Sequence, residues 1–295
     1  PAQLSSLRQV MTSNLGALNY AGSGSNASNV WASYNGNRQH TDADGSVGSH
    51  QWSSSTDGFT VGYTAGGDRF SWGVAAGHQD SDLDVEVLGA SGTQRGWNAG
   101  IYGALKGKRS YLNGILGYGN YKNETFGNAG KTSFDNKALS ASLEIGKHLS
   151  SDKKGGFTPY ASVLWTRIKQ DTAVIDSFAG SLLKGSNNSV FTTELGLRYN
   201  HRMFDERDSL KGGWQAGISW LHQGGDTGLG ANLGFVGVGG YYNLKSTPLD
   251  GNSLRVQLGA YGRIHGNLIG FAGYQGNFGS SQKINAVNAG VGYQF

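Results

Sequence analysis

Residues 287–295, at the carboxyl end of the chain, read Val-Asn-Ala-Gly-Val-Gly-Tyr-Gln-Phe. Apolar side chains take every second position in this stretch: Val287, Ala289, Val291, Tyr293 and Phe295. Successive side chains of a β-strand point to opposite faces, so the alternation predicts a strand with one apolar and one polar face. The polar face carries asparagine, glycine and glutamine and no charged residue.

The same period of two recurs upstream, in segments of about ten residues, the length of a tilted transmembrane strand. Clear examples lie at residues 59–64, 97–106, 139–146, 194–199, 214–220 and 254–261. Short connections lie at residues 66–68, 106–108, 150–156, 204–211 and 264–266, and long ones at residues 40–50, 81–93, 123–132, 171–189, 223–252 and 276–283. We therefore expect twelve antiparallel strands, an even number with alternating short turns and long loops, as in single-chain outer-membrane barrels.

The composition suits a sheet with water on one face and an apolar medium on the other. The 295 residues include 50 glycines and 3 prolines, which excludes collagen, and 7 Trp, 14 Tyr and 12 Phe, which argues against disorder. Charged residues make up 15%, against about 25% in soluble domains. The absence of cysteine excludes disulfide scaffolds and thiolate metal sites. The net charge of +4 is scattered, so we expect no nucleic-acid partner.

The polar face of the strands decides between a sandwich and a barrel. A soluble sandwich would expose many charged residues, whereas the polar positions here hold mostly glycine, serine, asparagine and glutamine. A closed barrel satisfies every backbone group in lipid, and aromatic residues at strand ends fit the two interfacial girdles of such barrels. These aromatic residues are Tyr63, Phe70, Trp72, Tyr199, Trp214, Trp220, Tyr293 and Phe295. We expect an all-β, twelve-stranded transmembrane barrel; the alternative is a soluble β protein with an aromatic core.

One segment near the start of the chain has the period of a helix instead. Between residues 3 and 19, apolar side chains recur at spacings of three and four, with polar residues on the other face. We expect residues 1–26 to form a luminal helix and linker, and residues 27–295 to form the barrel. No signal peptide opens the chain, so we expect an export signal further upstream. The expected helix residues are Leu4, Leu7, Arg8, Met11, Asn14, Leu15 and Leu18.

Short segments spread over nearly the whole chain resemble the autotransporter β-domain, the carboxyl-terminal translocator of type V secretion proteins in Gram-negative bacteria. They are DGFTVGY (57–63), WGVAAG (72–77), GIYG (100–103), PYAS (159–162), ELGLRY (194–199), WLH (220–222), GYQG (273–276) and AGVGYQF (289–295). The resemblance implies a barrel with a helix in its lumen, which exports its own passenger and anchors it at the cell surface. It also implies an outer-membrane monomer whose last strand is recognised by the barrel-assembly machinery, with help from periplasmic chaperones.

Strand parity places a small set of charged residues on the inner face. A charged side chain facing lipid costs about 2–4 kcal/mol at mid-membrane for Arg or Lys, so these residues should point inward. We expect them either to form a polar channel wall that contacts the helix or to pair with one another as structural elements. The candidate pore-lining residues are Glu144, Glu194, Arg198, Arg255 and Arg263.

Several family members cleave their own chain at an asparagine of the luminal helix. The self-cleaving serine-protease group uses an Asn-Asn pair, but this helical segment has only the separate Asn14 and Asn19. The pair Asn187-Asn188 falls in an expected loop. The sequence therefore does not support self-cleavage.

An alternative class is an outer-membrane barrel enzyme, such as an omptin-like protease with acidic and histidine pairs at its outer rim. Candidate residues are Asp80, Asp82 and Asp84 near one strand end and His222 with Asp226 near another. The histidines lack metal-binding spacing, and no nucleotide-binding or serine-nucleophile motif occurs. We therefore expect no enzyme activity, no metal and no cofactor.

Overall fold

The computed structural model describes residues 28–127, 130–149, 154–175, 180–204, 210–228, 230–235, 240–245 and 247–295. The expected luminal helix, with Leu4, Leu7, Arg8, Met11, Asn14, Leu15 and Leu18, lies outside the described residues. In the described part, the helical structure is one 3-10 turn, Glu86–Leu88. None of the helices found there is long and apolar enough to span a membrane.

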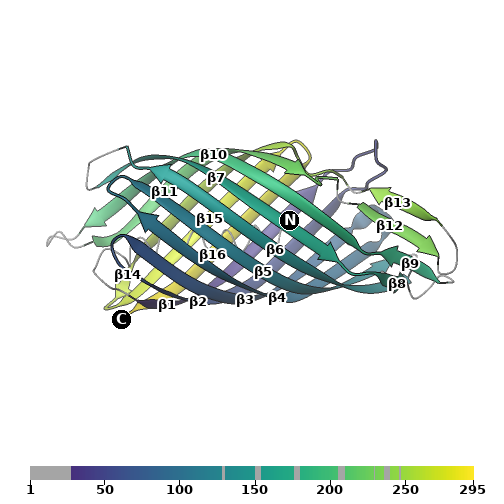
Figure 1. Ribbon diagram of the computed structural model, residues 1–295, viewed down its shortest axis with the longest axis horizontal. Helices are drawn as coiled ribbons and strands as arrows, with labels where there is room; N and C mark the ends of the chain where they lie inside the picture. The colour runs from purple at the N-terminus through teal and green to yellow at the C-terminus, as the bar shows by residue number, and fades with distance from the viewer. Residues whose placement is uncertain are drawn as a thin grey trace.

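Twelve long strands of the described chain form a barrel (Figure 1). They are β1 (Asn29–Thr41), β2 (Trp52–Gly66), β3 (Phe70–Val85), β4 (Ala90–Lys106), β5 (Ser110–Gly127), β6 (Gly130–Lys147), β7 (Gly155–Gln170), β10 (Ser186–Phe204), β11 (Leu210–Gly225), β14 (Asn252–His265), β15 (Leu268–Gly279) and β16 (Gln282–Gln294). All pairings are antiparallel. β1 pairs with β16 and β6 with β7, which closes the ring and confirms the predicted barrel.

Four short strands extend the sheet beyond one end of the barrel, on the right in Figure 1. They are β8 (Ala173–Ile175), β9 (Ser181–Lys184), β12 (Gly230–Phe235) and β13 (Tyr241–Lys245). They join the barrel where β8 pairs with β6, at Thr132 and Ile175. We call this end, where the longer connections lie, the loop end, and the opposite end the turn end.

The expected long loops at residues 81–93, 123–132 and 276–283 are mostly strand. The pair Asn187-Asn188 likewise lies at the start of β10 rather than in a loop. The sequence prediction failed here because it followed apolar alternation. Beyond the membrane both faces of the sheet meet water, so no apolar face is needed there. Backbone hydrogen bonds nevertheless continue the strands past that point.

The apolar side chains of the barrel strands point outward and stay exposed. On β6, for example, Leu139, Leu143 and Ile145 are 37%, 54% and 58% exposed, whereas the intervening Ser140, Ser142 and Glu144 are buried. Such an exposed apolar belt is large for a soluble monomer and matches the lipid-facing band of a membrane barrel.

Aromatic rings gather at both ends of this apolar belt, as the sequence predicts. At the turn end, ring contacts join Tyr63 to Trp72, Phe157 to Tyr199, Tyr199 to Trp214 and Tyr293 to Phe295. Nearer the loop end, His78 lies between Phe59 and Trp97, and Trp220 stacks on His222. These two girdles of amphipathic aromatic rings suit the two membrane–water interfaces.

Leu143→Arg tests the outward face. An arginine near the centre of the lipid-facing band should lower the free energy of unfolding by about 2–4 kcal/mol, whereas Ile145→Arg, closer to the interface, should cost about 1 kcal/mol or less. Urea unfolding in lipid vesicles, followed by tryptophan fluorescence, measures both. Equal losses for the two variants would contradict a lipid-facing β6.

Candidate functional site

The inner face of the barrel is lined by small polar and amide side chains. β1 is the plainest example, because its alternate side chains are buried and, apart from Trp31, polar. These buried polar residues of β1 are Asn29, Ser33, Asn35, Asn37, Gln39 and Thr41. Two buried ion pairs lie on the other half of the wall, between β5 and β15.

Glu194 on β10 is the centre of one charged cluster and is almost fully buried, at 1% exposure. Its Oε2 accepts a hydrogen bond from Arg255 Nη1 on β14 at 2.7 Å. Its Oε1 accepts hydrogen bonds from Tyr160 OH at 2.8 Å and from Ser219 Oγ at 2.7 Å. Arg255 Nε in turn donates to Asn277 Oδ1 at 2.8 Å. Three neighbouring side chains therefore fix this ion pair in one geometry, which a buried pair needs to offset its desolvation.

Glu144 and Arg198 form a second ion pair closer to the turn end. Nη1 and Nη2 of Arg198 face the two carboxylate oxygens of Glu144 at 3.3 and 3.5 Å. Tyr111 OH donates to Glu144 Oε1 at 2.9 Å. The Arg198 guanidinium also lies 4.2 Å from the centre of the Tyr160 ring, a cation–π contact.

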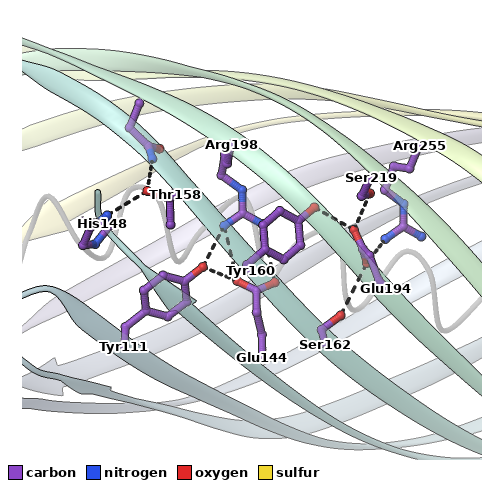
Figure 2. A network of polar contacts seen from close by, with 11 residues as sticks. Tyr111, Glu144, His148, Thr158, Tyr160, Ser162, Glu194, Arg198, Ser219 and Arg255 are labelled. Carbon is purple, nitrogen blue, oxygen red and sulfur yellow. Dashed lines mark hydrogen bonds and ion pairs between the residues drawn. The ribbon is translucent and has the colours of Figure 1, made fainter. Parts of the chain in front are cut away.

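Tyr160 joins the two clusters, since its ring contacts Arg198 and its hydroxyl binds Glu194 (Figure 2). The connected residues come from β5, β6, β7, β10, β11, β14 and β15, which follow one another around the barrel. The result is a belt of paired charges and hydroxyls that crosses seven neighbouring strands. Within it the positive and negative charges neutralise each other.

Glycine on neighbouring strands makes room for the tyrosine rings of the belt. A Cβ at Gly196 would lie 2.5 Å from Cζ of Tyr160, and one at Gly146 would lie 2.4 Å from Cε1 of Tyr111. Both rings thus lie flat against the wall, over a residue that has no side chain. At these two positions the inward glycines accommodate a ring.

Four of the five predicted pore-lining residues, Glu144, Glu194, Arg198 and Arg255, come together in the belt. Arg263 does not join them. It is exposed near the turn end, where the pairing of β14 with β15 shifts register between Arg263 and His265. Sequence reasoning missed the uncharged members Tyr111, Tyr160, Ser219 and Asn277, although their inward parity was a usable signal.

The candidate residues of the barrel-enzyme alternative are far from one another. β3 and β11 lie six places apart in the ring, so Asp80, Asp82 and Asp84 are across the barrel from His222. Asp80 faces Arg95 and His78 on the outer surface, and His222 contacts Asn252. Across the part of the chain that the structure describes, no group of acidic and histidine residues could hold a metal ion.

The profile of the family described as Autotransporter beta-domain matches residues 30–275 of this chain. The chain therefore belongs to the autotransporter β-domain family and is an outer-membrane translocator barrel. The translocators of this family are generally not enzymes.

Solved structures with this fold include other translocators. The translocator domain of NalP from Neisseria meningitidis is 18% identical, with a TM-score of 0.76 over 98% of this chain and 95% of that one. The transport unit of AIDA-I from Escherichia coli is also 18% identical, with a TM-score of 0.72 over 96% of this chain and 98% of that one. A curated relative, "Extracellular serine protease" of Serratia marcescens, is 24% identical over 155 residues, which span 52% of this chain but 14% of that protein.

A double-mutant cycle tests the Glu194–Arg255 pair. Glu194→Gln leaves the buried Arg255 charge without its partner and should lower the free energy of unfolding by about 3–5 kcal/mol. Adding Arg255→Gln should recover much of that loss, because no uncompensated charge remains. Glu124→Gln is the control, since it breaks an exposed pair with Lys131 and should cost about 1 kcal/mol or less. Strictly additive effects of the two substitutions, measured by urea unfolding in vesicles, would contradict this coupling.

Proposed function

We propose that this barrel exports an amino-terminal passenger through its lumen and anchors it at the surface of a Gram-negative bacterium. The observation that carries the proposal is the contrast between the two faces of one closed sheet. The outer face is apolar and the inner face is polar, so the wall separates lipid from a hydrated interior.

The direction of export follows from where the described chain enters the barrel. Asn29 pairs with Gln294 at the turn end, and Phe295 N–H donates to the carbonyl of Ser28 there at 2.9 Å. In bacterial barrels the short turns face the periplasm. A segment attached ahead of Ser28 would therefore start at the periplasmic opening of the barrel, and a passenger carried by it must cross the lumen to reach the exterior. We propose that residues 1–26 occupy the lumen as a helix and linker after export.

The inner wall offers a passing peptide many weak contacts and few strong ones. On β1, Ser33 Oγ and both amide atoms of Asn37 make no hydrogen bond within the described part of the chain. The buried charges Glu144, Arg198, Glu194 and Arg255 are already paired with one another. A chain in transit thus meets groups that can form weak, easily replaced hydrogen bonds, while the strongest charges of the wall are neutralised.

We further propose that the barrel works without enzymatic chemistry of its own. The energy for export would come from folding of the passenger outside the cell, with help from the barrel-assembly machinery, since the sequence has no nucleotide-binding motif. Periplasmic chaperones would accompany the chain before insertion. Self-cleavage has no support from an Asn-Asn pair in the proposed helical segment.

Fusion of a cysteine-free, unfolded reporter ahead of Pro1, behind a signal peptide, tests export. External protease should degrade the reporter in intact cells, because the lumen leads to the surface. Joint substitution of Asp82, Asp84, His222 and Asp226 by alanine should leave this display unchanged. A reporter that stays periplasmic while the barrel is inserted and folded would refute the translocator mechanism.

The last strand, β16, is the proposed assembly signal. Val287, Ala289, Val291, Tyr293 and Phe295 all present exposed side chains on its outer face. Deletion of Phe295 should lower the yield of inserted barrel several-fold, because the terminal aromatic side chain is lost from the recognised face. Removal of one residue from the connection between β11 and β14 should leave the yield near that of the wild type. Heat-modifiable migration of outer-membrane fractions measures both, and an unchanged yield without Phe295 would count against the signal.

A further inference from the structure

A group of three basic residues lies on the outer surface of β6 and β7, toward the loop end. Lys137, Arg167 and Lys169 all have exposed, outward side chains. We call these three residues the basic patch. Within the described part of the chain, none of them forms an ion pair; Arg167 Nε donates one hydrogen bond, to Asn187 Oδ1 at 2.8 Å.

Two charges of the basic patch repel each other directly. Lys137 and Lys169 are Cα partners in the pairing of β6 with β7, so their side chains leave the sheet side by side on the same face. Like charges opposite one another destabilise a sheet unless something neutralises them. Arg95 and Lys122, on β4 and β5, are a second pair of this kind, but Arg95 faces Asp80 at 3.3 Å and Lys122 faces Glu124 at 3.8 Å. Lys137 and Lys169 form no ion pair in the described part of the chain, although Asp135 and Asp171 lie two residues further toward the loop end.

The basic patch begins where the apolar band ends. Outward side chains of β7 are apolar or aromatic from Phe157 to Trp165, and the next outward residue is Arg167. At about 3.3 Å per residue and a tilt of about 40°, this segment is about 20 Å tall, close to the 25 Å apolar band of bacterial barrels. On β6, which runs in the opposite direction, Lys137 is the next outward residue beyond Leu139 toward the loop end. The patch therefore lies at the height of the lipid headgroups on the loop side.

We propose that the basic patch binds the phosphate groups of a phosphorylated lipid in the outer leaflet, whose acyl chains lie along the apolar faces of β6 and β7. The inference rests on the membrane placement in the proposed function, with the loop end outside. Phosphate oxygens accept charge-assisted hydrogen bonds from both lysines and from the free guanidinium nitrogens of Arg167, which removes the repulsion between Lys137 and Lys169. The neighbouring apolar band explains why a lipid, rather than a free anion, is the ligand.

The double variant Lys137→Gln with Lys169→Gln tests the proposal, in the full chain folded in non-ionic detergent. Its matched control is Arg38→Gln with Lys283→Gln, which removes two exposed basic residues toward the same end of β1 and β16. The probes are lipid A, an acylated glucosamine disaccharide with two phosphates, the same lipid without its phosphates, and inorganic phosphate. Native mass spectrometry reports the lipid retained over a titration.

We expect the patch variant to bind lipid A about tenfold or more weakly than the wild type, because basic residues at an anionic lipid surface each add to the attraction. The control variant should stay within about twofold, and Lys137→Arg with Lys169→Arg should keep the affinity. Lipid without phosphates should bind the wild type as weakly as lipid A binds the patch variant. Millimolar inorganic phosphate should not displace lipid A.

Three results would overturn the proposal. An equal loss in the control variant would show that total charge matters and not this patch. Equal binding of the lipid with and without phosphates would show that phosphate is not recognised, and displacement by inorganic phosphate would indicate a site for a free anion. If the glutamine variant fails to show heat-modifiable folding, the comparison of lipids on the wild type still decides. Reporter display by the arginine variant tests the translocator mechanism separately from the lipid site. Loss of display with retained lipid binding would count against the translocator mechanism alone.

Discussion

Closure of the sheet by backbone hydrogen bonds is the constraint on which the rest of this barrel depends. A strand edge in hydrocarbon leaves N–H and C=O groups without partners, at a cost of several kcal/mol for each group. The pairings of β1 with β16 and of β6 with β7 remove both edges. Once the ring is closed, the two-residue period of each strand divides the side chains into a lipid face and a luminal face, and every other feature of the wall follows from that division.

Charges on the luminal face are held differently from charges outside. Glu194 and Arg255 are joined by hydroxyl and amide partners from three further strands, whereas the outer Lys131–Glu124 pair is exposed. Tyr160 and its glycine neighbour Gly196 show how ring packing and ion pairing support each other, since the ring can reach Glu194 only because Gly196 lacks a side chain. The buried charges of the wall are thus held by several hydrogen bonds each, whereas amides such as Asn37 make none in the described part of the chain.

The sequence predicted the barrel, its strand number and the faces of most strands, because lipid and water impose a period of two on the side chains. It also placed Glu144, Glu194, Arg198 and Arg255 on one wall. It did not predict which of them pair. Glu194 and Arg255 are 61 residues apart, and their meeting depends on strand order and register, which no local pattern encodes. The loop-end strands were missed because backbone pairing in water needs no apolar alternation, and Arg263 because it lies at the turn end of β14, where side chains already reach water.

The bond between Phe295 and Ser28 places the two ends of the barrel chain side by side. β1 and β16 are therefore neighbours in space although they are the first and last strands in sequence. Of all the hydrogen-bonded seams in the ring, this one spans the greatest sequence separation, and such non-local contacts form slowly. The ring cannot close until β1 and β16 are both present and paired, and until then each of these two strands keeps an open edge.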